Sequence, residues 1–473
     1  MEGRGARAEA SGLAAGGAGG LSAPLCADAH SPPEDISGQK MERGRSLPYS
    51  GFRLPGLAGA GQGGSVGFRR EAAGTDWREG PGRIRCGLEE RERRVILVEH
   101  GPGEKPALFR QPRGLVVAEA PGEVLPALER AEAARRAGAW VAGWVGYEAG
   151  YALEPKLGPR MPEGRREPLL VLGLFDGPEP AAAVLDRAAD EGRGAAMTAP
   201  EPVVTRGAYD AAMARVQGYI AAGDCYQVNL TFPMAARLVS GTALGLYGAF
   251  RRTGAVGHGA FADLGVGPVV VSRSPELFFR LEAGGRIVTR PMKGTAPRDA
   301  DPERDAAIAE ALRASVKDRA ENLMIVDLLR NDISRLAKVG SVKVPALFAL
   351  ERYATVHQMT STVVGELAEA PALPGLMAAL FPCGSVTGAP KIRAMEIIRE
   401  VEPFPRGVYC GAVGWMAPDG TADFSVAIRT LSIWGDEIVM NVGGGVVHGS
   451  TAEGEWEEAL WKARFVNAAV SRG

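Results

Sequence analysis

The chain has 473 residues, of which 46% are hydrophobic and 23% are charged, and its formal net charge is −2. These totals are ordinary for a globular protein of about two or three domains. The near-neutral charge gives no reason to expect a nucleic acid or an anionic membrane as partner, and the sequence contains no apolar run long enough to cross a bilayer.

The amino-terminal segment has the composition of a disordered extension. Residues 1–45 are rich in Gly, Ala, Ser and Pro, so we expect them to be disordered, or Met41 to be the true start. The segment lacks the apolar core of a secretory signal. The five cysteines of the chain have no metal or disulfide spacing, which indicates the reducing cytoplasm.

Residues 46–190 are predicted to form an amino-terminal subdomain. Three apolar runs predict buried strands and one Ala- and Arg-rich run predicts a helix: Val95–Glu99, Trp140–Glu148, Leu169–Phe175 and, for the helix, Ala127–Ala137. The stretch 176–200, rich in Ala, Pro, Gly and Asp, is typical of a linker. We therefore place a second, catalytic domain at residues 200–473.

The second domain is predicted to begin with a helix that has clear ends. Thr205 suits the N-cap position, apolar residues follow at helical spacing, and Gly223 ends the helix. The sequence next predicts a strand at Cys225–Thr231. A hairpin is predicted from Leu277–Leu281 and Arg286–Thr289.

The remaining elements are mainly helical in their first half. Asp301 followed by Pro302 predicts a helix start, and a long helical stretch runs from about Ala306 to Ala337, broken once. The last helix is predicted from about Gly454 to Val470.

Lys293 lies in a segment with unusual local constraints, Arg290-Pro-Met-Lys-Gly-Thr-Ala-Pro-Arg298. Its prolines restrict the backbone and Gly294 permits a turn. Two flanking arginines would favour a neutral amine, which is a nucleophile. The alternative is a surface turn with a solvated lysine.

Two predicted helices each carry a pair of carboxylates on one face. Asp318 and Glu321 are three residues apart, as are Glu455 and Glu458, with Lys462 four residues further on. Two such pairs could hold Mg²⁺, which binds carboxylates, water and an anionic substrate. Ordinary charged helix faces are the alternative.

Three further features suit an anionic substrate. Gly443, Gly444 and Gly445 could present backbone N–H groups to a carboxylate, or could simply end a strand. Arg429 is a lone charge in an apolar run and needs an anionic partner. Glu276, shortly before the Lys293 segment, is a candidate general acid.

Several stretches, in order over residues 205–470, resemble the chorismate-utilising enzymes, which include anthranilate synthase component I, aminodeoxychorismate synthase component I, isochorismate synthase and salicylate synthase. The matching stretches are Gly223-Asp-Cys-Tyr-Gln-Val-Asn229, Ser274-Pro-Glu276, Pro291-Met-Lys-Gly-Thr295, Ala320–Asp332, Phe381–Lys391, Arg406–Gly414 and Glu453–Lys462.

Within this family, Lys293 distinguishes the activities. Anthranilate synthases resemble this chain but have alanine there, whereas lysine is the aminodeoxychorismate synthase pattern. Isochorismate and salicylate synthases carry a water-activating lysine at the place held here by Gln227. The resemblance therefore implies an aminodeoxychorismate synthase component I, with anthranilate synthase component I as the alternative.

The resemblance also implies a fold, a mechanism and a site. The fold is α/β, with two mainly antiparallel β-sheets packed around a central cleft and helices outside. Lys293 attacks chorismate, Glu276 protonates the departing hydroxyl, and ammonia displaces Lys293 to give 4-amino-4-deoxychorismate, a precursor of p-aminobenzoate and folate. Mg²⁺ is held by Glu321 and Glu458 with Asp318 and Glu455 behind them. The substrate-binding residues are Gln227, Thr387, Tyr409, Arg429, Gly443, Gly444, Gly445 and Lys462.

Two expectations about partners complete the sequence analysis. No glutaminase domain is visible, so a separate glutamine amidotransferase subunit is expected to supply the ammonia. A catalytically idle binding or regulatory relative is the alternative from another class. The intact carboxylate pairs and Lys293 argue against it.

Overall fold

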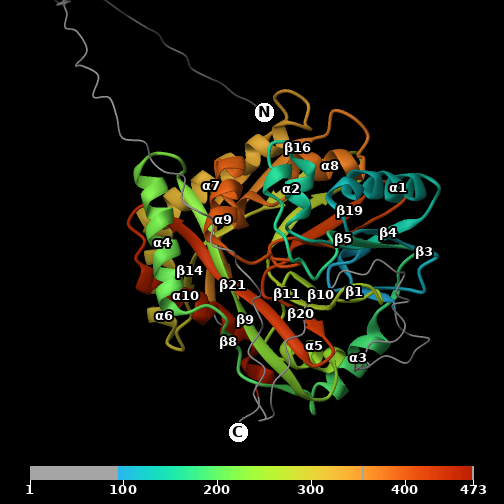
Figure 1. Ribbon diagram of the computed structural model, residues 1–473, viewed down its shortest axis with the longest axis horizontal. Helices are drawn as coiled ribbons and strands as arrows, with labels where there is room; N and C mark the ends of the chain where they lie inside the picture. Colours follow the sequence, from blue (N-terminus) through green and yellow to red (C-terminus); the bar gives the residue numbers. More distant parts are fainter. Residues whose placement is uncertain (1–93, 354–355, 471–473) are drawn as a thin grey trace, which may run out of the picture. The chain divides into compact units, whose positions relative to one another are not determined.

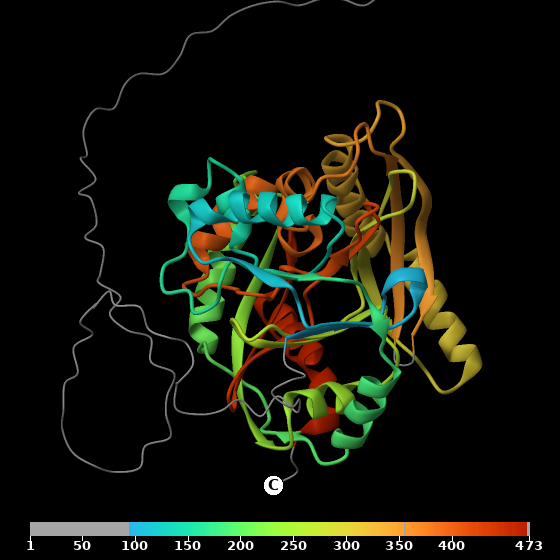
Figure 2. The ribbon, with the colours of Figure 1, turned by 90° about the vertical axis from the view of Figure 1, so that its right-hand side faces the viewer.

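The computed structural model describes residues 94–353 and 356–470, which form two β-sheets with helices on the outside (Figures 1 and 2). The strand pairs run antiparallel, as in the pairs of the longest strands. The predicted fold class is therefore confirmed. The predicted extension 1–45 lies outside the described residues.

The first sheet has 11 strands. Its order is β17 (Gly388–Ala389), β9 (Gln227–Ser240), β21 (Glu437–Val447), β20 (Thr430–Trp434), β11 (Val269–Ser274), β10 (His258–Asp263), β1 (Val95–Val98), β2 (Ala107–Arg110) and β6 (Glu179–Pro180), with β7 (Ala196–Met197) and β8 (Glu201–Pro202) on β9.

The second sheet has 10 strands. Its order is β14 (Met292–Pro297), β16 (Val356–Glu366), β13 (Arg286–Arg290), β12 (Leu277–Leu281), β19 (Ala422–Val426), β18 (Ala412–Met416), β4 (Trp140–Val145), β5 (Leu170–Phe175) and β3 (Gly114–Ala118), with β15 (Lys343–Arg352) on β16.

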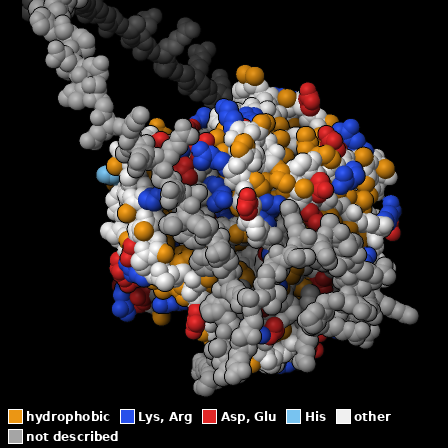
Figure 3. Space-filling view, in the orientation of Figure 1, with side chains coloured by type: hydrophobic (Ala, Val, Ile, Leu, Met, Phe, Trp, Pro, Cys, Tyr) orange, Lys and Arg blue, Asp and Glu red, His pale blue; other side chains and the backbone are white. Residues whose placement is uncertain are grey.

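The described α-helices lie outside these sheets (Figure 1). They are α1 (Val124–Arg136), α2 (Ala149–Leu153), α3 (Ala182–Glu191), α4 (Arg206–Ala221), α5 (Ala243–Arg251), α6 (Pro302–Ala314), α7 (Val316–Ser334), α8 (Leu373–Leu380), α9 (Lys391–Val401) and α10 (Ala452–Ala463). Within the described part of the chain, no helix is long and apolar enough to span a bilayer. On the face seen in Figure 3, basic and acidic side chains are interspersed.

A continuous apolar core joins the two sheets. It contains Ile96 and Ala260 from the first sheet and Trp144, Val413 and Trp415 from the second, all 5% exposed or less. Each sheet draws strands from both sides of residue 200, for example β1 with β10 and β4 with β18. The division into domains at residues 46–190 and 200–473 stays a prediction.

Local capping signals account for the helix boundaries that the sequence predicts. The Thr205 hydroxyl accepts a hydrogen bond from the third amide of α4, and Gly223 follows the helix with φ +81°. Asp301 caps α6 in the same way. Ser315 ends α6 and caps α7, which confirms the single break in the long helical stretch.

The predicted linker at 176–200 is wrong, because this stretch contains the helix α3. Ala188 is its one fully buried residue, and Val184 and Leu185 are partly buried against the core. The helix packs closely on α5 at Gly248, where an added Cβ would lie 1.7 Å from the carbonyl oxygen of Ala188. With only two large apolar residues, the alanine-rich helix has a sequence that resembles a linker.

This contact predicts opposite effects for two helical glycines. Gly248→Ala forces the α5 backbone away from α3 and should lower the free energy of unfolding by roughly 3 kcal/mol or more. Gly218→Ala in α4 meets no atom within 4 Å and should raise it by about 0.5–1 kcal/mol. Urea denaturation of both variants measures the difference, and equal effects would refute the close packing.

Candidate active site

The glycine tract lies in β21 and forms ordinary β pairs with β9, Gly443 opposite Thr231 and Gly445 opposite Asn229. The amides of Thr231 and Asn229 donate to groups outside β21, so both pairs are non-hydrogen-bonded pairs of the antiparallel ladder. In such pairs, the N–H and C=O groups of each residue point away from the partner strand. Strand β20 pairs with β21 only as far as Met440, so the Gly443 and Gly445 amides face an open edge.

Lys293 lies on a strand, not in the loop that its prolines suggested. It belongs to β14, the edge strand of the second sheet, and the pairing register shifts between Met292 and Thr295. Gly294 has φ +91°, and a Cβ there would come within 3.1 Å of Asp318. The side chain of Lys293 is 16% exposed, so it is not a solvated surface lysine.

The amine of Lys293 reaches across to the first sheet. A Cβ added at Gly445 would lie 2.5 Å from Lys293 Nζ and 2.9 Å from the side-chain amide of Gln227. Both polar atoms of the Gln227 amide are buried and lack a hydrogen-bond partner among the described residues. An unsatisfied buried polar group costs about 1–3 kcal/mol, so a ligand that bonds to it would be stabilised here.

The two arginines near Lys293 in sequence are engaged elsewhere. Arg290 forms an ion pair with Glu351, and Arg298 donates to Asp305 at 2.7 Å. Each guanidinium is therefore compensated by its own carboxylate. The sequence argument that these cations would favour a neutral amine is wrong, and the carboxylate nearest to Lys293 Nζ is Glu321, at 3.8 Å.

The predicted carboxylate pairs lie on α7 and α10, and the charges of the same lysines act on both helices. Lys293 and Lys317 both lie near Glu321, at 3.8 and 3.9 Å, and their charges also act on Glu458. Desolvation raises the pKa of Glu458, but the Lys462 amine, 2.8 Å away, together with the charges of Lys293 and Lys317 outweighs it, and the pKa is lowered. The Glu458 side chain is 55% exposed, which leaves room for water around it.

Glu455 is the more buried acid of α10. Burial raises its pKa, opposed by a 2.7 Å hydrogen bond from Ser450, and the Glu458 charge raises it further. A Cβ at Gly444 would lie 2.7 Å from Glu455 Oε2, so a larger residue there would displace the Glu455 carboxylate. Lys462 also donates to the Gly443 carbonyl at 2.9 Å, which ties α10 to the glycine strand.

Glu276 is fully enclosed between β11 and β12. Burial raises its pKa to about 7, although a 2.7 Å hydrogen bond from Ser385 and the charges of Lys293, Arg429 and Lys462 lower it. A carboxyl group with this pKa is protonated in part at neutral pH. It can therefore donate a proton, as a general acid must.

Arg429 and Lys462 line a cavity of about 290 Å³ beside these groups. Arg429 has φ +51°, and burial lowers the pKa of its guanidinium. With Arg273 and Arg464, four cationic side chains line this cavity, and they favour an anionic ligand.

Thr387 and Tyr409 are buried behind the glycine strand and do not line this cavity. The Thr387 hydroxyl donates to Cys383, and its carbonyl accepts from the Asn229 amide on β9. Burial raises the pKa of Tyr409 well above its ordinary value. Their predicted contact with substrate remains a prediction.

Sequence reasoning missed three residues that hold the site together. Ser385 bonds Glu276, Gln358 donates to the Gly294 carbonyl at 2.8 Å, and Asn322 contacts the Lys293 carbonyl at 3.4 Å. Each is an uncharged polar residue with no distinctive spacing. Only their position beside predicted motifs could have pointed to them.

Comparisons with known proteins agree on the family. The chorismate binding enzyme family matches residues 95–468. Aminodeoxychorismate synthase component 1 of Klebsiella aerogenes is 45% identical over 263 residues, 56% of this chain and 58% of that protein. Anthranilate synthase component 1 of Cereibacter sphaeroides is 37% identical over 379 residues, 80% of this chain and 71% of that protein.

A solved structure shares the fold. Anthranilate synthase component I from Streptococcus pneumoniae TIGR4 superposes with a TM-score of 0.63 and 24% identity, over 82% of this chain and 95% of that one. The aligned region spans little more than half the length of the Klebsiella relative. Together with the family match over residues 95–468, these findings show that the chain belongs to the chorismate binding enzyme family.

Proposed function

We propose that the chain is an aminodeoxychorismate synthase component I, which converts chorismate and ammonia to 4-amino-4-deoxychorismate. The observation that carries this proposal is the position of Lys293. Its amine lies against Gly445 and Gln227, and its charge acts on the buried acid Glu276. The relative from Klebsiella aerogenes, named for this activity, is 45% identical over the shared region.

The binding step uses the cations and the open backbone groups. Chorismate carries two carboxylates. One fits the cavity lined by Arg429 and Lys462, and Lys462 also donates to the Gly443 carbonyl. The open-edge amides of Gly443 and Gly445, and the Gln227 amide, which has no hydrogen-bond partner among the described residues, are available to polar groups of the bound substrate or of ammonia.

The chemical steps use Lys293 and Glu276. The Lys293 amine, after it loses a proton, forms a bond to C2 of chorismate, both ring double bonds shift, and the C4–O bond breaks. Glu276 gives its proton to the departing oxygen, which leaves as water. Ammonia then bonds to C4, the C2–Nζ bond breaks, and Lys293 is released as the product forms.

We include Mg²⁺ because the donor set suits it. Glu321 on α7 and Glu458 on α10 both feel the charges of Lys293 and Lys317, and the Glu458 carboxylate is partly exposed to water. These two residues would hold the ion, with Asp318 and Glu455 behind them. When bound, Mg²⁺ supplies positive charge to a substrate carboxylate.

The proposal includes a partner and a place in metabolism. A glutamine amidotransferase subunit supplies the ammonia, as the designation "component 1" of the relatives suggests, and the product serves p-aminobenzoate and folate synthesis. The reaction takes place in the cytoplasm. The free thiols of Cys225, Cys383 and Cys410 suit a reducing compartment.

Anthranilate synthase component I is the second candidate, because a relative of that name matches a larger share of the chain. One experiment separates the two. The purified chain is incubated with chorismate, Mg²⁺ and an ammonium salt, and the product is identified by mass spectrometry and chromatography. 4-Amino-4-deoxychorismate supports the proposal, anthranilate supports the second candidate, and unchanged chorismate favours an idle relative.

Replacing Lys293 should separate binding from turnover. Lys293→Ala removes the amine but leaves Arg429 and Lys462, so chorismate should still bind. The rate of 4-amino product formation should fall by several orders of magnitude. Lys317→Ala is the matched control, because Lys317 also lies near Glu321 but is 71% exposed. Near-normal 4-amino product from Lys293→Ala would contradict covalent catalysis.

Replacing Glu458 should reproduce the effect of metal removal. Glu458→Gln keeps the size of the side chain but removes a ligand charge, so turnover should fall by about 100-fold or more with little change in melting temperature. EDTA should inactivate the wild type, and added Mg²⁺ should restore only the wild type. Glu457→Gln, the exposed neighbour on α10, should behave as wild type. Full activity in EDTA would rule out the Mg²⁺ site.

The raised pKa of Glu276 should appear in protein stability. Its pKa is about 7 in the fold against an ordinary 4.5, so its contribution to stability is present below about pH 4.5 and is lost as the pH rises through 7. Glutamine stays neutral at every pH. Glu276→Gln should therefore raise the free energy of unfolding by roughly 2 kcal/mol more at pH 8 than at pH 5, measured by urea denaturation.

Glu369→Gln, at an exposed position, is the control for this measurement. Its effect should be small and similar at both pH values. A Glu276→Gln effect that does not grow with pH would mean that the carboxyl group is not held in a raised-pKa environment.

A further inference from the structure

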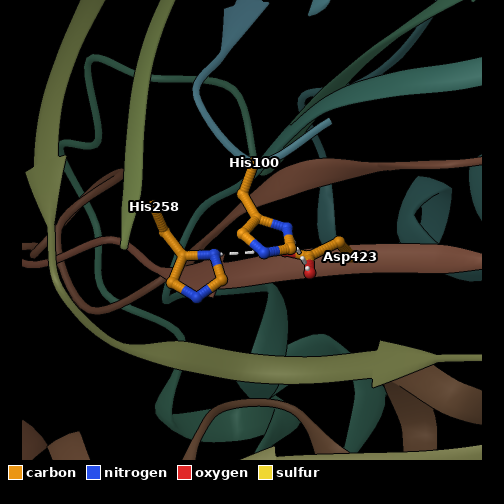
Figure 4. A group of neighbouring side chains, drawn as sticks. All are labelled: His100, His258 and Asp423. Atoms are coloured by element: carbon orange, nitrogen blue, oxygen red, sulfur yellow. Dashed lines mark ion pairs between the residues drawn. The ribbon is translucent and has the colours of Figure 1, made fainter. Parts of the chain in front are cut away.

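A second cluster of ionisable side chains lies between the two sheets (Figure 4). His100 follows β1, and His258 begins β10 of the first sheet. Asp423 belongs to β19 of the second sheet. Their ligand atoms lie within 4.8 Å of one another, and no other group of three metal-ligating residues was found among the residues that the structure describes.

The distances in this cluster match those of a metal site. His100 Nδ1 lies 3.2 Å from Asp423 Oδ2, and His258 Nδ1 lies 3.2 Å from Asp423 Oδ1. With metal–ligand bonds of about 2.0–2.1 Å, the ligand atoms of a tetrahedral site are roughly 3.3 Å apart. Each imidazole is thus about as far from the carboxylate as two ligands of one ion are, and the ligand atoms of all three residues lie within 4.8 Å of one another.

The space beside the cluster suits an ion and excludes an organic ligand. Its volume is about 10 Å³, and its walls include Val98, Val413 and Trp415 of the core between the sheets. A single water needs about 10–15 Å³. The Asp423 and His258 side chains are 4% and 9% exposed, so a bound ion would be shielded from bulk solvent.

Asp423 lies between the two imidazoles. Each of its two carboxylate oxygens is 3.2 Å from the Nδ1 atom of one histidine. Two neutral imidazoles with one carboxylate form a ligand set that suits Zn²⁺ and related transition metals.

Arg280 is the cation that now compensates Asp423. Its Nε donates to Asp423 at 2.9 Å, and a terminal nitrogen lies 2.7 Å from His100 Nε2. Arg280 also reaches the exposed Glu104 at 3.1 Å. A metal on His100 Nδ1 requires the proton on Nε2, where Arg280 can no longer donate, so the guanidinium would turn toward Glu104.

We propose that His100, His258 and Asp423 bind one transition metal ion of the Zn²⁺ class, which links the two sheets, and that Arg280 takes its place when the metal is absent. A water completes the coordination. The site is independent of the proposed Mg²⁺ site, because it uses imidazole ligands and none of the carboxylates of α7 or α10.

Co²⁺ is the probe for this site, because four-coordinate Co²⁺ absorbs visible light much more strongly than six-coordinate Co²⁺. Untagged protein, treated with chelator and then dialysed, is titrated with Co²⁺. We expect an intense visible band that saturates at one ion per chain and disappears when Zn²⁺ is added. Zn²⁺ should also raise the melting temperature of the wild type.

The variants assign the band to the cluster. His258→Ala and the conservative Asp423→Asn should each lose it, while circular dichroism and melting curves report whether each variant is folded. His448→Ala removes an exposed imidazole elsewhere, and Glu458→Gln removes a carboxylate of the proposed Mg²⁺ site. Both should keep the band.

Arg280→Gln distinguishes a metal site from a hydrogen-bonded cluster. Removing the competing cation should tighten Co²⁺ binding by about tenfold or more. Absence of an intense band in both the wild type and Arg280→Gln would overturn the proposal. A band that survives in folded His258→Ala or Asp423→Asn would also overturn it.

Discussion

The buried ion pair between Glu402 and Arg406 fixes the position of β9, the strand that pairs with the glycine strand β21 of the candidate active site. Its side chains are 2% and 1% exposed. Glu402 accepts from the Thr231 amide and Arg406 donates to the Asn229 carbonyl. These bonds satisfy the groups of β9 that face away from β21, and so fix the register of the two strands. A slip of one residue would reverse the direction of every glycine amide in β21. Removing one partner of such a pair costs about 3–5 kcal/mol, so stability and site geometry depend on the same contact.

The candidate site gathers groups that are each costly without a ligand. The Gln227 amide is buried without a partner, Glu276 holds a proton at a raised pKa, and Arg429 is a buried cation. A substrate with two carboxylates and a leaving hydroxyl could form a favourable contact with each of these three groups. In the free protein, the strands and helices that carry these residues are held in place by hydrogen bonds of Ser385, Gln358 and Lys462, which offset the cost of burying them. Such preorganisation aligns the site before substrate arrives.

Local signals in the sequence were enough for element boundaries but not for the contacts between elements. The caps at Thr205 and Asp301 act within one turn, so they could be predicted. The prolines around Lys293 predict a loop, yet the segment is a strand, because an edge strand tolerates proline. The meeting of Lys293, Gln227 and Gly445 joins residues far apart in sequence, and only the family resemblance pointed to it. The cluster of His100, His258 and Asp423 has no sequence spacing that marks it, because it forms only when the sheets pack.

The interleaving of early and late strands has a consequence for how the chain is made. Strand β4 lies between β5 and β18, and β1 lies between β2 and β10. During synthesis, the open edge of β4 therefore waits for β18, which begins only at Ala412, far along the chain. Exposed edges of this kind can pair with other chains, and distant pairings are slow to form. The second sheet thus stays unfinished while the residues between these strands are made, and in that interval the nascent chain is exposed to wrong strand pairing.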